Sequence, residues 1–552
     1  MASVECYEQF VKSYKIAVKL NWTRENLAEF LGLIPDSVRR KVGKINDALG
    51  VGLPQLPLGK KKLTEEMIKK FKDAYNEMEA KKNGIKKDSK VYLVTAAQNA
   101  TPIHTGFYES CMEFCKERGA EFIVIPYRYK NPNSLWSHGD ADHEWWATKL
   151  QPYINSDKTE LCDNLVVLGN MKMQPTQSEP LSGLEGFSGM DSTIVGHPKI
   201  QLKSVPTLNG KPKVMLSTGS ITVPNYTDSK AGHKAAFHHS IGAVVVEVDD
   251  DGTFHVRHVH GSDKNGSFYD LDKHYSPAGV TSGHRVEALI TGDTHAEFMD
   301  DIVEAATYHA SDSIVNVLRP KKTFLHDVVD FYARNHHHRG NDILMYGKHK
   351  NGRNNVQEGL QQAADFIDRI SRKDMEVVVV KSNHDEAFDR WLREADIKSD
   401  PENADFYYYM KYNQLKSVKM SPTGFDSFDP FKFWCLNPEN GKGLRSTSTT
   451  RFLKRDESMK ICSVEVGFHG DVGANGSRGD IKGLARLSDK MVIGHSHSPG
   501  IYEGCYQVGL SAMTNLEYKR GPSSWMQTHC VIYPDGKRTL INIINGKWKG
   551  ER

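Results

Sequence analysis

The sequence contains no apolar run long enough to cross a lipid bilayer, which takes about 18–20 residues. Its first residues, Met1 to Cys6, show no basic segment followed by an apolar stretch, so no signal peptide is expected. Only eight of the 552 residues are cysteine, and no two of them form a Cys-x-x-Cys pair. This cysteine usage argues against a disulfide scaffold and is typical of a protein of the reducing cytoplasm.

Three further features are missing. The formal net charge is only +3, so the chain as a whole favours no strongly charged partner. No glycine-rich phosphate loop is present, because Gly183, Gly186 and Gly189 recur at the wrong spacing and follow no predicted strand. Neither an internal repeat nor a low-complexity segment is visible. The sequence therefore predicts neither a nucleotide-binding glycine loop nor a repeat protein.

The chain is long enough for two to four ordinary domains. Its composition is that of a globular protein, with 38% hydrophobic and 26% charged residues. The pattern of strand-like and helix-like segments divides it into three parts. Residues 1–88 are predicted to form a small helical module, residues 89–280 an α/β domain, and residues 281–552 a second α/β domain.

The N-terminal module combines basic charge with a short pattern like that of a helix-turn-helix. Fifteen Lys and Arg residues, against seven acids, lie in the range 39–90. One helix is expected over 22–32 with Thr23 as its cap, and a second helix is expected to follow it. In a helix-turn-helix the second helix enters the major groove of DNA. A helical hairpin or an arm for self-association is the alternative interpretation. The predicted DNA contacts are Arg39, Arg40 and Lys41.

The middle part alternates between strand-like and helix-like segments, and its chemistry is not indicated. The strand over 90–95, the helix over 106–118 and the strand over 121–125 predict a βαβ unit. A hairpin with a turn at 249–252 is also expected. The histidines of this part are interpreted as surface or hydrogen-bonded residues rather than as ligands. Two more buried strands are predicted, over 165–169 and 213–216.

Residues that commonly bind metals follow the strand-like segments of the C-terminal part. Strands are expected over 285–290, 374–380, 461–468 and 490–493. Because open α/β sheets hold their active sites at the carboxyl ends of strands, we expect these residues to meet at one edge. The clusters are Gly292-Asp293-Thr294-His295, His326-Asp327, Asn383-His384, Gly467-Phe468-His469 and Gly494-His495-Ser496-His497.

This set of side chains suits divalent metal ions. It offers aspartate, asparagine and histidine but no thiolate, which favours Mn²⁺, with Fe or Zn²⁺ as alternatives. Two such ions about 3.5–4 Å apart can clamp the attacking and leaving oxygens of a phosphate ester during in-line displacement. The sequence therefore predicts a metal-dependent phosphoesterase.

The order of these motifs resembles the calcineurin-like metallophosphoesterase superfamily over residues 281–552. The resemblance implies a four-layer α/β/β/α sandwich that binds two divalent metal ions. It also implies that His384, beside a ligand but not itself one, is the catalytic acid. The implied ligands are Asp293, His295 and His497 for one ion and Asn383, His469 and His495 for the other, with Asp327 shared by both.

The chain departs from the superfamily pattern in two places. Where that pattern usually has Gly-Asp, this chain has His326-Asp327, so an imidazole is expected close to the metals. The interval over 385–469 is long and rich in aromatic residues, which we interpret as core packing or, alternatively, as a surface for stacking bases. Two loops near the motifs are expected to reach the substrate phosphate. The residues predicted for this contact are Arg334, Asn335, His336 and Arg478.

The three parts together, with His326-Asp327 and the histidine-rich segment after it, resemble the pre-early DNA-degrading proteins of T-odd siphophages. This resemblance implies a DNA nuclease that acts on host DNA in the host cytoplasm. DNA and further copies of the chain, in a homo-oligomer, are the expected partners. A phosphatase or small-molecule phosphodiesterase whose N-terminal parts serve assembly is the first alternative. A DNA-binding protein with a purely structural metal site is the second.

Overall fold

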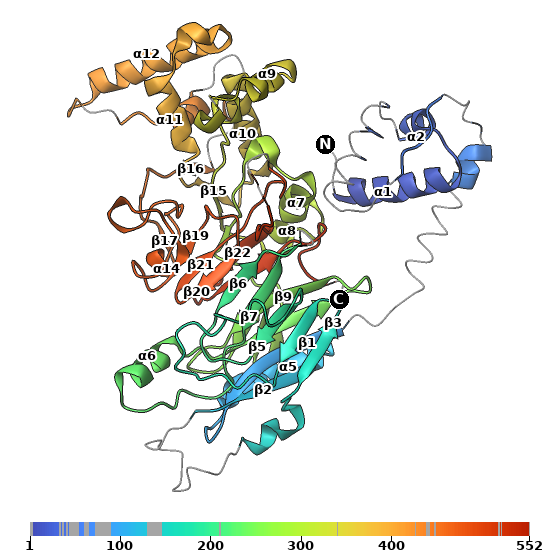
Figure 1. Cartoon of the computed structure of the whole chain (residues 1–552), viewed down its shortest axis with the longest axis vertical. Coiled ribbons are helices and arrows are strands. Elements are labelled where there is room, and N and C mark those ends of the chain that lie inside the picture. The colour runs from blue at the N-terminus through green and yellow to red at the C-terminus, as the bar shows by residue number, and fades with distance from the viewer. Residues whose placement is uncertain are drawn as a thin grey trace.

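The computed structural model of the chain is an α/β protein in which an N-terminal helical module lies beside a main body of sheets and helices (Figure 1). Among the described residues, no helix is both long and apolar enough to cross a membrane. The described residues are 4–31, 35, 38–39, 42, 54–59, 64, 66–71, 90–129, 146–208, 211–338, 340–424, 427–437, 442–445, 449–516, 519 and 521–550.

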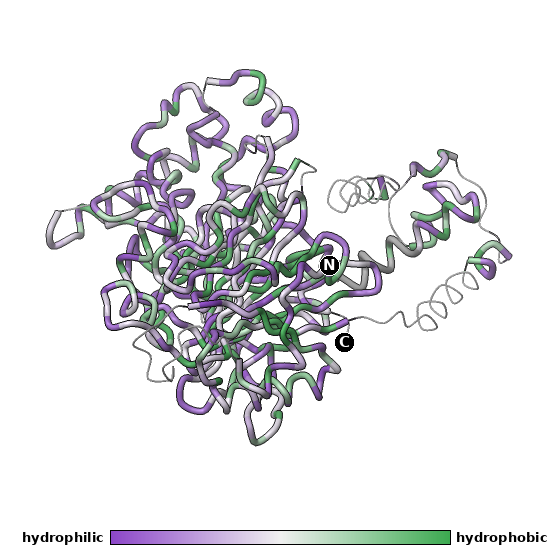
Figure 2. Tube along the Cα trace, turned by 60° about the horizontal axis from the view of Figure 1, so that its bottom comes forward, coloured by the Kyte–Doolittle hydropathy of each residue, from purple (hydrophilic) through white to green (hydrophobic). Residues whose placement is uncertain are grey.

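The N-terminal module contains the helices α1 (Val4–Lys19) and α2 (Arg24–Phe30). As predicted, Thr23 caps α2, because its hydroxyl accepts a hydrogen bond from the amide of Asn26 at 3.2 Å. The module has an apolar cluster of its own that includes Trp22 and lies to one side of the main body in Figure 2, and Ile302 of α7 (Asp301–Glu304) packs against it. It is therefore a separate core rather than an extension of the sheets.

The residues predicted to contact DNA are only partly described. Val38 is buried in the core of the module, as a helix-turn-helix would require, and Arg39 is exposed. Arg40 and Lys41 lie outside the described residues. DNA contact by this module stays a prediction.

The main body contains a six-stranded sheet that carries four of the predicted metal ligands, Asp293, His295, Asp327 and Asn383, at one edge. In spatial order its strands are β16 (Thr450–Phe452), β15 (Glu376–Val379), β14 (Lys322–Leu325), β13 (Ala288–Ile290), β22 (Thr528–Ile532) and β23 (Arg538–Asn542). The strands β13 to β16 are mutually parallel, whereas β22 pairs with β13 and β23 in antiparallel fashion. The carboxyl ends of β13, β14 and β15 therefore meet at the same edge.

A ten-stranded sheet joins residues from the predicted middle and C-terminal parts. In spatial order its strands are β17 (Lys460–Ile461), β18 (Val464–Glu465), β19 (Met491–Ile493), β21 (Cys505–Gln507), β20 (Gly500–Tyr502), β6 (Leu202–Val205), β7 (Lys213–Ser217), β5 (Ser192–Val195), β4 (Leu165–Leu168) and β3 (Lys158–Cys162). Because β20 pairs with β6, the sheet is continuous across residue 280. Whether the parts on either side fold independently stays a prediction.

The middle part also has a four-stranded sheet, and its predicted elements are confirmed. In spatial order its strands are β2 (Glu121–Tyr127), β1 (Lys90–Gln98), β8 (Gly242–Val248) and β9 (Phe254–His260). Helix α5 (Thr105–Arg118) connects the parallel strands β1 and β2 as a βαβ unit, and β8 and β9 form the hairpin. A small three-stranded sheet follows, with β10 (Phe268–Asp270), β11 (Lys273–Ser276) and β12 (Gly279–Thr281).

Alternate side chains of the six-stranded sheet serve two different cores. Val377 and Val379 of β15 pack against helices, whereas Val378 faces the ten-stranded sheet. On the outer face of β19, Met491 packs against the short helix α14 (Ile481–Leu484). The α/β class is thus confirmed, and the specific four-layer sandwich stays a prediction. The other helices are α6 (Lys230–His238), α7 (Asp301–Glu304), α8 (Ile314–Leu318), α9 (Asp342–Lys350), α10 (Val356–Ile370), α11 (Asp385–Glu394), α12 (Ala404–Met420) and α13 (Pro430–Leu436).

Candidate metal centre

The ends of five strands place all the predicted ligands. In the six-stranded sheet, Asp293 follows β13, Asp327 follows β14 and Asn383 follows β15. In the ten-stranded sheet, His469 follows β18, while His495 and His497 follow β19. Because strands are rigid and buried, their ends hold these side chains in fixed positions, as metal geometry requires.

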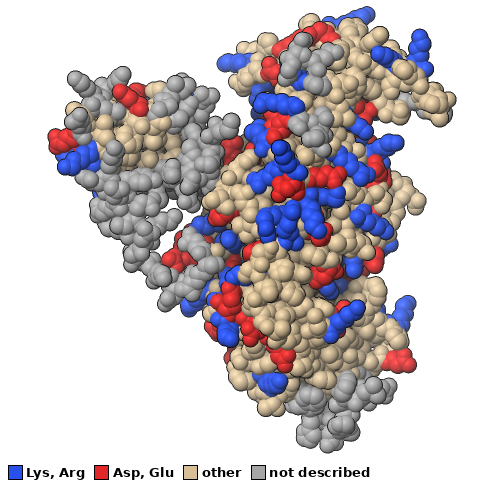
Figure 3. Space-filling view, turned by 180° about the vertical axis from the view of Figure 1, so that it is seen from behind, with Lys and Arg blue, Asp and Glu red and all other residues tan. Residues whose placement is uncertain are grey.

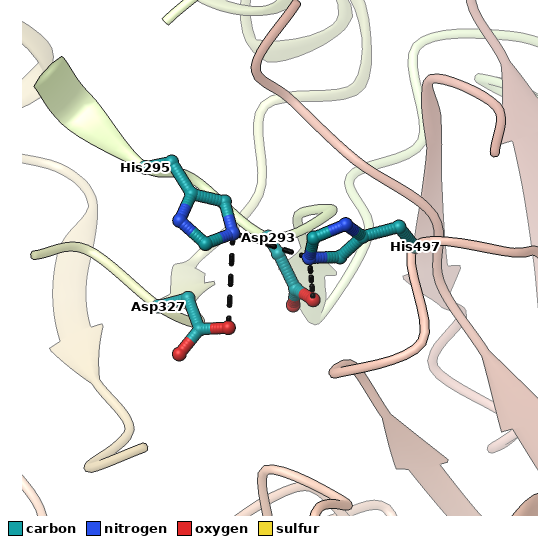
Figure 4. A group of neighbouring side chains, drawn as sticks. All are labelled: Asp293, His295, Asp327 and His497. Atoms are coloured by element: carbon teal, nitrogen blue, oxygen red, sulfur yellow. Dashed lines mark hydrogen bonds and ion pairs between the residues drawn. The ribbon is translucent and has the colours of Figure 1, made fainter. Parts of the chain in front are cut away.

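Four buried side chains make the closest group, and they point toward one another in Figure 4. Nε2 of His497 lies 3.2 Å from Oδ2 of Asp293 and 3.1 Å from Nε2 of His295. Nε2 of His295 lies 3.8 Å from Oδ2 of Asp327. All their ligand atoms lie within 4.8 Å of one another. This buried cluster of two carboxylates and two imidazoles could hold a divalent metal ion.

Two other predicted ligands, His469 and His495, lie next to each other, and His469 also contacts Asp327. Nε2 of His469 is 3.3 Å from Oδ2 of Asp327, and the rings of His469 and His495 are 5.3 Å apart. Asp327 therefore contacts both His295 and His469. A carboxylate shared by two ions would need this position between two groups of ligands.

Several buried oxygens of the centre accept no hydrogen bond from the described residues. They are Oδ1 of Asp293, Oδ1 of Asp327 and the side-chain oxygen of Asn383. A buried polar atom without a partner costs about 1–3 kcal/mol, so native proteins retain such atoms where something else satisfies them. A divalent cation would do so here, and the residues present fit one.

The backbone around the centre is strained. Four of the predicted ligands have φ angles in the left-handed region, where L-residues other than Asn and Asp are uncommon. They are His295 at 42°, Asp327 at 45°, His495 at 75° and His497 at 59°. Gly494 is required for a different reason, because a Cβ atom there would lie 2.3 Å from Oδ1 of Asp293. Strain of about 1–3 kcal/mol per residue persists at functional sites, so this geometry supports a functional role.

The charges of the centre shift its proton affinities. Burial alone would raise the pKa of Asp327, but His469 beside it holds that pKa well below its usual range. Burial alone would lower the pKa of the histidines, but Asp330 raises that of His295 to about 9, and Asp327 raises that of His469 to about 9. A metal ion would therefore displace protons from His295 and His469 as it binds.

Asp330, which the sequence interpretation did not assign to the site, positions two histidines. Its Oδ1 accepts a hydrogen bond from Nδ1 of His295 at 2.8 Å, and its backbone oxygen accepts one from Nδ1 of His384 at 3.1 Å. His295 therefore turns its Nε2 toward the cluster, as in metal sites where a carboxylate orients the ligand. His384 is partly exposed, and its ring centroid lies 4.8 Å from that of His295. The Asp-x-x-Asp spacing of Asp327 and Asp330 is the sequence feature that could have identified it.

His326 lies against the centre, as its unusual motif predicted, and it contacts a ligand. The Nδ1 atoms of His326 and His469 are 3.4 Å apart, and His326 is fully buried. Burial lowers the pKa of His326 to about 4, so its ring is neutral and can accept a hydrogen bond. His469 then donates through Nδ1 and keeps Nε2 directed toward Asp327.

The residues predicted to contact substrate phosphate differ in their exposure and in their contacts within the protein. Arg334 makes a two-pronged ion pair with Asp400, at 2.5 and 2.6 Å, so a phosphate would have to share or displace this partner. Asn335 is buried, and its side-chain oxygen accepts a hydrogen bond from the amide of His337. His336 lies in a short 3₁₀ turn, and Arg478 is exposed. Their contact with substrate stays a prediction.

Comparison with known proteins gives one relative of high similarity. No protein-family model matches the chain, and no solved structure matches it. The chain is 35% identical over 473 residues to Protein A1 of Escherichia phage T5, across 84% of this chain and 83% of that protein. The chain belongs to the family of phage T5 Protein A1.

Proposed function

We propose that this protein is a metallophosphoesterase of the calcineurin-like type that cleaves phosphodiester bonds in DNA. The observation that carries the proposal is the convergence of Asp293, His295, Asp327 and His497, with His469 close by, on one buried point with unsatisfied oxygens. The relationship to a phage protein supports action in an infected host cell, and the proposed role there is degradation of host DNA early in infection. The proposed cofactor is a pair of divalent ions, with Mn²⁺ favoured over Fe and Zn²⁺.

The residues have distinct roles in this proposal. When bound, the ions would supply an acidified water and a positive clamp on the phosphate oxygens. Asp327 would be shared by both ions, because its Oδ2 lies near a histidine of each group of predicted ligands, His295 and His469. Asp330 orients His295, and His326 orients His469. The proposed ligands are Asp293, His295 and His497 for one ion and Asn383, His469 and His495 for the other.

His384 is the proposed catalytic acid. Asp330 accepts a hydrogen bond from its Nδ1 atom, which leaves Nε2 on the opposite side of the ring. The side chain is 19% exposed, in contrast to the fully buried His295 beside it. A partly exposed imidazole next to the metal ligands can donate a proton to a leaving oxygen.

A nucleic-acid substrate is supported by an open hollow of about 670 Å³ whose lining includes residues from the segment that carries Asn383 and His384. Lys381 and Glu386 line it and flank Asn383 and His384 in sequence. Three phenylalanines supply flat apolar surface on which bases could stack. They are Phe428, Phe433 and Phe452. The aromatic residues predicted either to pack or to stack thus include some that face an open surface.

The charge of this hollow favours a polyanion. Its lining contains six basic side chains and three acidic ones. Lys381 is paired with Asp389 and Asp429, at 3.1 and 3.2 Å. Three other cations make no ion pair with any residue that the structure describes, so they remain open to phosphate groups. They are Arg393, Lys432 and Lys454.

The N-terminal module is proposed to add affinity for DNA. Arg39 is exposed there, and Figure 3 shows further Lys and Arg side chains gathered on one face of the main body, mixed with acidic ones. Replacing Arg39, Arg40 and Lys41 together by alanine is expected to weaken DNA binding and to flatten its dependence on salt. Unchanged affinity and salt dependence would contradict this role. Self-association stays a prediction from sequence.

The main alternative is a phosphatase or small-molecule phosphodiesterase, since a pair of metals does not by itself select a substrate. Parallel assays on plasmid DNA, linear DNA and p-nitrophenyl phosphate, each with Mn²⁺, separate the two functions. The proposal expects Mn²⁺-dependent loss of intact DNA. Intact DNA together with hydrolysis of p-nitrophenyl phosphate would favour the phosphatase.

A further inference from the structure

The two halves of the ten-stranded sheet are built in the same way. In one half, β3 is antiparallel to β4, β4 is parallel to β5, β5 is parallel to β7, and β6 is antiparallel to β7. The other half repeats this pattern. There β17 is antiparallel to β18, β18 is parallel to β19, β19 is parallel to β21, and β20 is antiparallel to β21. The sequence of parallel and antiparallel strand pairs is therefore the same when it is followed from either edge of the sheet.

The two smaller sheets repeat one another as well. In the four-stranded sheet, β1 is parallel to β2 and antiparallel to β8, and β8 forms a hairpin with β9. In the six-stranded sheet, β13 is parallel to β14 and antiparallel to β22, and β22 forms a hairpin with β23. Among the residues that the structure describes, the strands β15 and β16 have no counterpart in the four-stranded sheet.

Small details of the chain path agree with this match. Two residues after β7 lies Gly219, and two residues after β21 lies Gly509. The next residue makes an isolated parallel bridge in both halves, Ser220 with Ile241 and Leu510 with Gln527. Gly196, which follows β5, also corresponds to Gly494, which follows β19. A Cβ atom on Gly196 would contact Ile125 and Ala96, and one on Gly494 would contact His326 and Asp293.

The junction between the halves has the geometry of a two-fold axis. Leu216 of β7 and Tyr506 of β21 each lie three residues before the matched glycine, so they occupy equivalent positions. Leu202 pairs with Leu216 and Ile501 pairs with Tyr506, which makes Leu202 the counterpart of Ile501. These two counterparts, Leu202 and Ile501, pair directly with each other where β6 meets β20. Two copies of one fold would associate in this way through identical edge strands.

We infer that residues 90–260 are a degenerate, metal-free copy of the fold that carries the metal centre, retained as a structural partner that covers the edge strand β20. The inference rests on the proposed metal centre but not on the substrate. It corrects the sequence-based expectation that no internal repeat exists. The repeat lies in backbone pairing and not in residue identity.

The positions of the metal ligands have changed in the copy. Ala96 lies beside Gly196 as Asp293 lies beside Gly494, so Ala96 occupies the position of Asp293. Ile125 matches His326 in the same way, so Pro126 takes the place of Asp327. The strand β4 is followed by Gly169-Asn170, with no histidine. An alanine and a proline cannot replace two metal-binding carboxylates.

One histidine is retained, and the protein itself satisfies it. His197 follows Gly196 as His495 follows Gly494. Nδ1 of His197 accepts a hydrogen bond from the amide of Lys199 at 3.0 Å, and Nε2 donates one to the backbone oxygen of Gln174 at 3.1 Å. With both ring nitrogens used, His197 has no free position for a metal.

Instead of a metal ligand, the copy has an ion pair that links it to the metal-bearing half. The segment that holds His497 in one half holds Lys199 in the other. The buried ammonium of Lys199 donates to the backbone oxygen of Ser178 at 2.6 Å and to Glu503 at 3.0 Å. Glu503 lies in the turn between β20 and β21, so this ion pair crosses the junction. The pairing of β6 with β20 also protects an edge strand that would otherwise be open to aggregation.

A matched pair of variants tests the inference in the full-length protein loaded with Mn²⁺. His495→Ala is expected to lose bound metal, as measured by elemental analysis of the purified protein. His197→Ala is expected to keep the metal content of the unchanged protein while lowering its Tm. His197→Asn, which retains a donor and an acceptor, serves if the alanine variant does not fold. Loss of metal from a folded His197 variant would overturn the inference.

Anomalous diffraction from Mn²⁺ in crystals of the same protein locates the ions directly. The expected map has peaks beside Asp327 and none beside His197. Peaks at both places would overturn the metal-free copy and leave the proposed function intact. Peaks at neither place would remove the distinction between the copies and would contradict the proposed metal centre as well.

Discussion

Oδ1 of Asp330 lies 2.8 Å from Nδ1 of His295, and this contact leaves Nε2 as the ring nitrogen directed toward the candidate metal centre. The same residue holds His384 through its backbone oxygen. One aspartate that is not itself a proposed ligand therefore positions both a proposed ligand and the proposed catalytic acid.

Asp330→Asn is expected to weaken metal binding by about 10–100-fold, because it replaces a charged acceptor with a neutral one behind His295. Titration of the metal-free protein with Mn²⁺ in a calorimeter measures this change. Asp342→Asn, at an exposed position on α9, is the matched control and should leave the affinity unchanged. Equal affinities for the Asp330 variant and its control would show that the contact does not orient the ligand.

His384→Ala is expected to lower turnover by about 10²–10⁴-fold, the usual contribution of a general acid. Metal content should not change, because no ligand is removed. Steady-state cleavage of DNA and elemental analysis of the same preparation provide the two readouts. His337→Ala, at an exposed neighbouring histidine, is the control. Loss of metal from the His384 variant would reassign this residue as a ligand.

Gly494→Ala is expected to abolish metal binding without unfolding the protein. The added Cβ atom would lie 2.3 Å from Oδ1 of Asp293 and would push this ligand out of place. Gly347→Ala in α9 is the control, since no atom lies within 4 Å of the added group there. The control should stabilise the protein by up to about 1 kcal/mol. Normal metal content in the Gly494 variant would mean that Asp293 is not a ligand.

Arg393→Ala combined with Lys432→Ala is expected to raise the KM for DNA and to flatten its salt dependence, because two phosphate-binding cations leave the hollow. Hydrolysis of p-nitrophenyl phosphate, which is too small to span the hollow, should not change. Lys158→Ala combined with Lys264→Ala, both at exposed positions of the middle part, is the control. If the two double variants behave alike on DNA, the hollow is not the path of the substrate.

Stability should fall in acid between about pH 6.5 and pH 4, because three buried histidines outside the centre resist protonation. Burial lowers the pKa of His197, His239 and His258 to about 4, from an ordinary value of 6.5. In this window the unfolded chain binds more protons than the folded protein, so each histidine removes up to about 1.4 kcal/mol of stability per pH unit of acidification.

Thermal unfolding at a series of pH values, with His258→Asn as the comparison, measures this effect. The variant lacks one titrating group and should lose stability less steeply as the pH falls. An identical slope for both proteins would indicate that His258 is already protonated when folded.

The sequence predicted where the side chains of the candidate metal centre would gather, because this information is local. A buried strand followed at once by Asp, Asn or His can be recognised in a few residues, as at Asp293 and His469. The role of Asp330 could not be predicted, because it depends on the turn that brings this residue back to His295. The ion pair of Arg334 with Asp400 spans 66 positions, so its effect on phosphate contact was equally hidden.

The repeated fold was invisible in the sequence for a related reason. Strand order and register are set by backbone hydrogen bonds, which many sequences can satisfy, so Leu202 and Ile501 correspond although their surroundings differ. The ligand motifs, which would have marked the repeat, survive in only one half. The boundary predicted near residue 280 follows a change in residue pattern, whereas β6 and β20 join across it.

The most direct test of the central claim is the cleavage of plasmid DNA by protein that has been stripped of metal and then supplied with Mn²⁺, in the unchanged form and as Asp327→Ala. The account predicts that the unchanged protein degrades DNA only after Mn²⁺ is added. It also predicts that Asp327→Ala, which lacks the carboxylate that contacts both His295 and His469, leaves the DNA intact. Equal cleavage by the two proteins, or cleavage without any divalent metal, would contradict it.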